Sequence, residues 1–114
     1  MKIEKFEDII SWKKSQTLAV TVYSLFSKNK DFGFKSQIER ATISIGNNIA
    51  EGYERKGNKE FKQFLFIAKG SCGEVRSMLY VALELKYISK EEFKTLINSA
   101  EEISRLLSGL IKTL

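Results

Sequence analysis

The stretch QIERATISIGNNIAEGYER, from Gln37 to Arg55, decides how this chain folds. At the 100° step of an α-helix its apolar residues share one face with Phe34, which lies just before it. This face consists of Phe34, Ile38, Ala41, Ile45, Ile49 and Gly52. The pattern predicts a long amphipathic helix that packs against other helices.

A polar stripe runs beside this apolar face. It is formed by Gln37, Arg40, Ser44, Asn48, Glu51 and Arg55, with Ile43 and Ala50 on its far side. Because apolar residues flank the stripe on both edges, we expect both edges to pack against protein. An enclosed polar group without a partner costs about 1 to 3 kcal/mol. We therefore predict a hydrogen-bonded lattice between helices or between subunits, formed by Arg40, Asn48, Glu51 and Arg55.

The remainder of the chain also predicts helices. Proline is absent, and no window alternates apolar and polar residues as a half-buried strand does. Helical spacing of apolar residues and turn residues divides the chain into four helices. We expect them at about 8–27, 36–54, 59–87 and 90–114, with Ser36, Asn58 and Ser89 as N-caps and a turn at 29–34.

These helices predict an all-α fold, an up-down-up-down antiparallel four-helix bundle in one domain spanning residues 1–114. Gly70 and Gly73 leave two alternatives for the third helix: a kink or loop, or a continuous helix whose small residues let a neighbouring backbone approach. We prefer the continuous helix. The third and fourth helices are expected to be longer than the first two, which would leave apolar surface uncovered where they join or let another subunit cover it.

The composition argues against catalysis, metal binding and a membrane-spanning segment. The chain has no histidine and one cysteine, so Ser44 and Ser71 lack an activating base, and the usual metal ligand is missing. Cys72 is expected to be a buried thiol. No run of apolar residues is long enough to span a bilayer, and the first residues lack an export signal. We expect no catalytic residue, no metal, no cofactor and a cytoplasmic location.

The charge balance suggests a different kind of partner. The chain has a net charge of +5, and Lys62, Lys69 and Arg76 recur every seven residues along the third helix. We expect them opposite its apolar face. The other bases expected near this row are Lys13, Lys14, Arg55, Lys56 and Lys59. Such a face could bind the phosphates of RNA or DNA, bind an acidic protein instead, or be an ordinary solvated surface.

Two segments, RATISIGNNIAEGYER at 40–55 and FLFIAKGSCGEVRSML at 64–79, resemble a known bacterial family. It is the four-helix-bundle family named for proteins encoded by intervening sequences in 23S rRNA genes. The resemblance implies a homo-oligomer, typically a ring-like pentamer. A similar fold accompanies reverse transcriptases in diversity-generating retroelements, which adds such a protein to the expected partners. The resemblance also adds Ser71 and Glu74 to the structural lattice with Arg40, Ser44, Asn48, Glu51 and Arg55.

Overall fold

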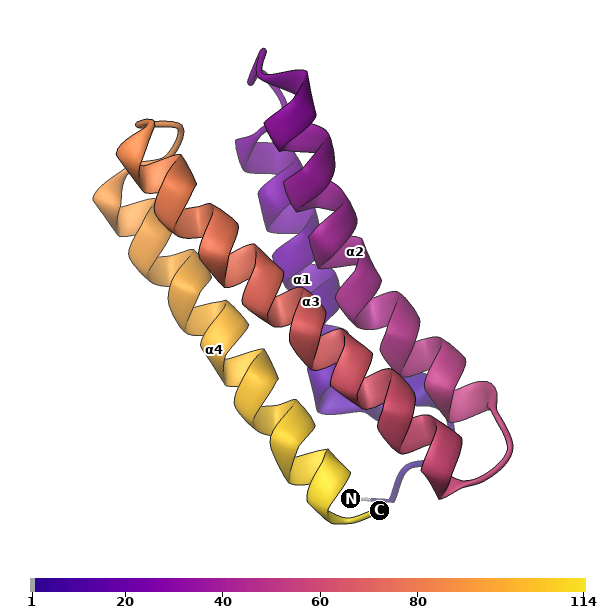
Figure 1. Ribbon diagram of the computed structural model, residues 1–114. Helices are drawn as coiled ribbons and strands as arrows, with labels where there is room; N and C mark the ends of the chain where they lie inside the picture. Colours follow the sequence, from indigo (N-terminus) through magenta and orange to yellow (C-terminus); the bar gives the residue numbers. More distant parts are fainter. Residues whose placement is uncertain (1) are drawn as a thin grey trace.

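Four antiparallel helices account for most of the fold. The computed structural model describes residues 2–114, in which a short 3₁₀ turn, η1 (Phe6–Asp8), precedes the four helices. They are α1 (Ile10–Leu25), α2 (Phe32–Glu54), α3 (Asn58–Glu84) and α4 (Lys90–Lys112). They run up and down in turn, and each packs against its two neighbours in the order α1, α2, α3, α4 and back to α1 (Figure 1). The predicted up-down-up-down bundle is confirmed.

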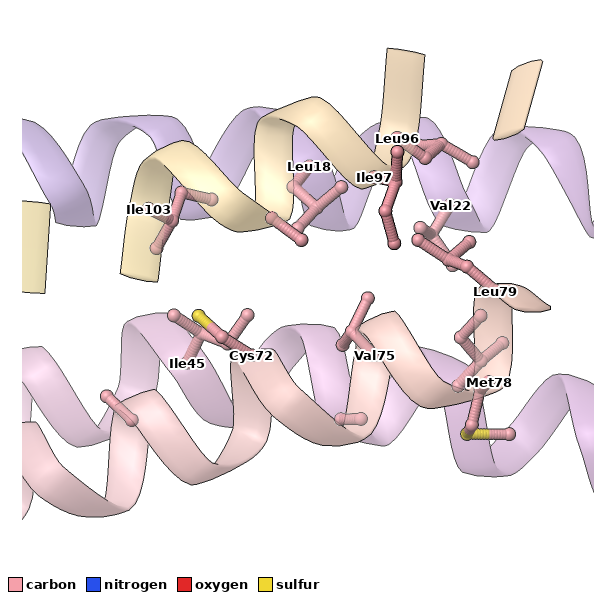
Figure 2. Close-up of a cluster of buried hydrophobic side chains, with 14 of the residues drawn as sticks. Leu18, Val22, Ile45, Cys72, Val75, Met78, Leu79, Leu96, Ile97 and Ile103 are labelled. Carbon is pink, nitrogen blue, oxygen red and sulfur yellow. The ribbon is translucent and has the colours of Figure 1, made fainter. Parts of the chain in front are cut away.

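The core lies between the α1–α4 pair and the α2–α3 pair. Figure 2 shows Leu18, Val22 and Ile103 on one side facing Ile45 and Val75 on the other. The apolar face predicted for the second helix is buried, with Ile38, Ile45 and Ile49 at 0 % exposure. Each such side chain contributes about 1.5 to 3 kcal/mol by leaving water. This apolar face therefore directs α2 into the bundle.

The start of α2 corrects a predicted boundary. The helix begins at Phe32, and the Asp31 carboxylate caps it by accepting a hydrogen bond from Phe34 N at 3.2 Å. Ser36 lies inside the helix and is not the cap. Asp31 is a strong N-cap residue and comes earlier in the chain, so the predicted turn at 29–34 ends before Phe32.

The other boundaries differ less. Asn58 is the first residue of α3, after Gly57 with φ 87°, and is not its cap. In front of α1, the Asp8 carboxylate accepts from Glu4 N and Lys5 N, which caps the start of η1, and α1 begins only at Ile10. Beyond α3, Lys86 takes a positive φ of 62°, so the helix cannot reach 87. The capping box that starts α4 is confirmed, because Ser89 Oγ accepts from Glu92 N at 3.0 Å and Ser89 N donates to Glu92 Oε1 at 2.8 Å.

Glycines allow close helix packing on α2 and not on α3. The helix α3 is continuous, as preferred, but a Cβ added at Gly70 or Gly73 would meet no atom within 4 Å. The close contact expected there is therefore absent within the chain. A Cβ at Gly52 would lie 2.5 Å from Phe64 Cβ, and one at Gly46 would lie 2.8 Å from Ser15 Oγ. These two glycines bring α2 against α3 and α1.

The helix α1 has 16 residues and is shorter than α3 and α4, which have 27 and 23. The helix α2 has 23 residues, fewer than α3 but as many as α4, so the expected inequality holds fully only for the first helix. The α1–α2 pair diverges from the α3–α4 pair toward the α3–α4 turn (Figure 1). Tyr80, Val81 and Leu85 are about half exposed in this part of α3, at 56 %, 46 % and 51 %. Apolar surface is thus uncovered at the predicted end. No helix in residues 2–114 is long and apolar enough to cross a bilayer.

Candidate interaction surfaces

A small polar cluster connects α2 to α3. Ser71 Oγ donates to Ser44 Oγ at 2.9 Å, and Asn48 Nδ2 donates to Ser44 O at 2.8 Å and to Ser44 Oγ at 3.0 Å. Ser71 is 9 % exposed, while Ser44 and Asn48 are half-buried. Three predicted lattice residues therefore form a hydrogen-bonded contact between helices.

Glu51 and Arg55 form a second contact at the end of α2. Arg55 Nη2 donates to Glu51 Oε2 at 2.7 Å, and this hydrogen bond raises the pKa of Arg55. The guanidinium carbon lies 5.2 Å from the centre of the Phe64 ring of α3. Both charged side chains remain about half exposed, at 53 % and 49 %. Such a surface pair contributes little to stability.

Arg40 and Glu74 do not join the lattice within one chain. Both are exposed, and among residues 2–114 neither forms an ion pair or a side-chain hydrogen bond. They line a shared open hollow between α2 and α3 of about 600 Å³. Ile43, on the outer edge of the stripe, is 38 % exposed. Within residues 2–114 of one chain, only Ser44, Asn48 and Ser71 of the predicted lattice join α2 to α3 by hydrogen bonds. The alternative that the other residues meet a second subunit stays a prediction.

The predicted basic row lies elsewhere than expected. Lys69 Nζ donates to Ser108 Oγ at 2.6 Å, and Arg76 Nη2 lies 3.5 Å from Glu101 Oε2, so both side chains face α4. Lys14 Nζ likewise lies 3.3 Å from Glu102 Oε1. Lys69 and Arg76 are therefore half-buried beside α4, not opposite the apolar face of α3, and Lys62 is also half-buried. Lys69 and Arg76 do lie on one side of α3, as their spacing predicts, but α4 packs against that side.

The remaining predicted bases gather at the α2–α3 turn. Among the described residues, Lys13, Lys56, Lys59 and Lys62 form no ion pair. Lys56 and Lys59 are exposed in and just after the turn, and Lys62 follows one helical turn later. The start of α1, which carries Lys13, lies at this same end of the bundle (Figure 1). Residues 55–62 hold four bases and one acid, Glu60.

The described residues offer no obvious reactive group. Cys72 is fully buried, and burial raises the pKa of its thiol to about 12 even though Lys69 and Arg76 lie near. At neutral pH the thiol is protonated and shielded, which is the opposite of a nucleophilic cysteine. Within residues 2–114 no three histidine, cysteine, aspartate or glutamate side chains gather as a metal site would require.

Comparison with known proteins gives the family. Residues 7–109 match the family described as 23S rRNA-intervening sequence protein. The chain belongs to this family. It is also similar to the crystal structure of a protein of unknown function from the S23 ribosomal protein family of Bacteroides thetaiotaomicron VPI-5482. The two are 30 % identical, with a TM-score of 0.84, over 90 % of this chain and 99 % of that one. A comparison with curated proteins finds no match.

This member of the 23S rRNA-intervening sequence family also exposes an apolar ridge that its sequence did not predict. Ile67 and Leu85 are 53 % and 51 % exposed, whereas Val75 and Leu79 of the same helix are fully buried. We call the outward side of the helix the α3 ridge. It consists of Phe66, Ile67, Gly70, Gly73, Glu74, Ser77, Val81 and Leu85. The sequence signal for this ridge is that the apolar residues of α3 spread over more of the helix surface than the neighbouring helices can cover.

A second exposed patch lies on α1 and α2. Tyr23 is 44 % exposed, and Val20 is 70 % exposed. Tyr23, Arg40, Ile43 and Asn47 line a common hollow of about 290 Å³. We call the surface formed by Val20, Tyr23, Arg40, Ile43 and Asn47 the α1–α2 face.

Proposed function

We propose that this chain is a non-enzymatic scaffold that assembles with copies of itself and contacts RNA or DNA through its basic end. The observation that carries the nucleic-acid part is the cluster of Lys56, Lys59 and Lys62, none of which forms an ion pair with an acid of the described residues. Lys13 extends the cluster from α1. Lysines arranged in this way hold phosphates without reading bases, so binding should depend on charge and hardly on sequence.

The family description makes RNA the first nucleic acid to test, because it refers to 23S rRNA intervening sequences. Assembly would strengthen a weak contact, since several copies of one basic end act together on a long polyanion. The resemblance of the sequence to the family implies a pentamer. An acidic protein is the competing partner, and direct binding measurements distinguish the two.

The nucleic-acid part predicts a specific loss of binding. Replacing Lys56, Lys59 and Lys62 together with glutamate should abolish binding of generic RNA and duplex DNA, measured by fluorescence anisotropy at low salt. For the wild-type chain, log K should fall linearly with log salt, by about 0.7 to 0.9 for each phosphate contacted. Circular dichroism should show unchanged helicity, because these side chains contribute no ion pair among residues 2–114.

The matched control carries the same charge change at the other end of the bundle. Lys28, Lys90 and Lys94 are exposed near the α1–α2 and α3–α4 turns, and their replacement with glutamate should leave most of the binding. Equal losses in both triple variants would mean that net charge alone drives retention. If the wild-type chain binds neither nucleic acid at low salt, the nucleic-acid part is wrong.

A further inference from the structure

The α3 ridge carries two glycines that a single chain does not need. A Cβ at Gly70 or Gly73 would meet no atom within 4 Å, yet each glycine costs about 1 kcal/mol in a helix interior relative to alanine. Phe66 and Ile67 on one side and Val81 on the other are 46–54 % exposed. A bare backbone between exposed apolar side chains leaves room for another protein surface to approach closely.

The charges on this ridge define what can cover it. Every exposed residue of α3 from 63 to 85 is apolar, neutral or acidic, although the chain as a whole has a net charge of +5. Glu74 is the acid at the centre of the ridge and has no partner in the described residues. A complementary surface is therefore apolar, with a base in it.

The α1–α2 face of the same chain has this chemistry. Val20, Tyr23 and Ile43 are its exposed apolar residues, and Arg40 is an exposed base without an ion pair in residues 2–114. The hollow lined by Tyr23, Arg40 and Ile43 could receive a side chain such as Phe66. Glu51 also lines this hollow, but its carboxylate is paired with Arg55, which leaves Arg40 as the unpaired charge there. The two surfaces are therefore complementary in polarity and in their unpaired charges.

We propose that the α3 ridge of one copy packs against the α1–α2 face of a second copy, which brings Glu74 to Arg40 of that copy. A symmetric contact of ridge with ridge would oppose two Glu74 side chains and leave the α1–α2 face bare. A head-to-tail contact covers both surfaces, and repetition of it closes a ring when the rotation between copies allows. This inference rests on the self-assembly part of the proposed function, for which it names the contact.

The test separates assembly from folding. Light scattering should give the wild-type chain a multiple of its 13.1 kDa mass. In Gly73→Leu the mass should fall to that of one chain, because the leucine blocks the approach of the second copy. The melting temperature of the separated chain should not fall, since the new side chain meets no atom within 4 Å and leucine favours a helix. Gly109→Leu is the matched control, because Gly109 is equally open but lies on α4; its mass should equal that of the wild type.

Charge exchange tests the pair itself. Glu74→Arg and Arg40→Glu should each weaken assembly about tenfold or more, and the double variant should restore it, because the opposite charges meet again. A wild-type chain that stays a monomer would overturn both this contact and the self-assembly part of the proposed function. An unchanged mass in Gly73→Leu would overturn the contact alone. Failure of the double variant to recover would overturn the pairing of Arg40 with Glu74.

Discussion

Single glycines have opposite roles in this bundle, and their neighbours determine which. Gly52 faces Phe64 so closely that an added Cβ would lie 2.5 Å from Phe64 Cβ, an atom fixed to the α3 backbone. Gly70 faces open space. The same residue type therefore permits helix packing at one position and leaves helix propensity unused at the other.

Replacement by alanine should separate these roles. Gly52→Ala forces α2 from α3, and an overpacking cost near the upper end of about 1 to 3 kcal/mol should exceed the gain in helix propensity of about 1 kcal/mol. We expect a net loss of about 2 kcal/mol in the free energy of unfolding. Gly70→Ala should gain about 1 kcal/mol. Urea unfolding in dilute solution, where assembly does not contribute, measures both; a Gly52→Ala variant as stable as wild type would contradict the close contact.

For single residues, the sequence predicts the position correctly where the side chain is fully buried or where its contacts lie within one helix. Ile38, Ile45 and Ile49 follow the helical period and are buried, and Cys72 is buried as expected. Arg40 and Glu74 were expected in a lattice that the chain does not enclose. Whether Lys69 faces solvent or Ser108 depends on where α4 packs beside α3, and no pattern within α3 contains that information.

At the scale of elements, caps and turns hold the ends of the helices in place. Asp31 caps α2 and also accepts a hydrogen bond from Tyr87 Oη at 2.5 Å, which connects the α1–α2 turn to the α3–α4 turn. The Tyr87 hydrogen bond, followed by that from Phe34 N, lowers the pKa of Asp31. The hydrogen bond to Asp31 raises the pKa of Tyr87. Both shifts indicate that the pair favours charged Asp31 and neutral Tyr87.

This pair should make stability depend on pH. A carboxyl whose pKa falls on folding stabilises above about pH 4, and this contribution is lost as the pH falls through the lowered value. A phenol whose pKa rises stabilises below about pH 10, and its contribution is lost as the pH rises through the raised value. Tyr87→Phe should therefore lower the melting temperature at pH 7, and the difference from wild type should shrink at pH 2.

Tyr80→Phe is the matched control for this change, because Tyr80 is exposed and its hydroxyl has no hydrogen bond among residues 2–114. It should leave the melting temperature unchanged at both pH values. A loss in Tyr87→Phe that is the same at pH 2 and pH 7 would show that the charge of Asp31 is not involved.

The Ser89–Glu92 capping box could be predicted from spacing within one helix, whereas the link from Asp31 to Tyr87 could not, because it joins residues far apart in the sequence.

At the scale of the whole molecule, the bundle core and the outer surfaces are separate. The interior is mostly apolar, with a few buried hydroxyl groups such as that of Ser71, and the groups that could meet partners lie on the α3 ridge, the α1–α2 face and the basic end. Four apolar stripes suffice to predict the bundle. The surfaces were harder to predict, because their residues follow the same helical period as the core and differ from it only in what the neighbouring helices cover.

A buried thiol offers a direct measure of how cooperatively this core opens. Cys72 lies at 0 % exposure, and burial raises the pKa of its thiol to about 12, so a thiol-reactive dye should label the native chain only through opening of the bundle. Leu96 packs toward the α3–α4 turn, away from Cys72 (Figure 2). Leu96→Ala should cost about 2 to 5 kcal/mol, so if the bundle opens as one unit, labelling should become roughly 30- to 4,000-fold faster. Glu91→Ala, an exposed change on the same helix, should leave the rate unchanged. Rapid labelling of the wild-type chain, or no acceleration in Leu96→Ala, would show instead that the region around Cys72 opens independently.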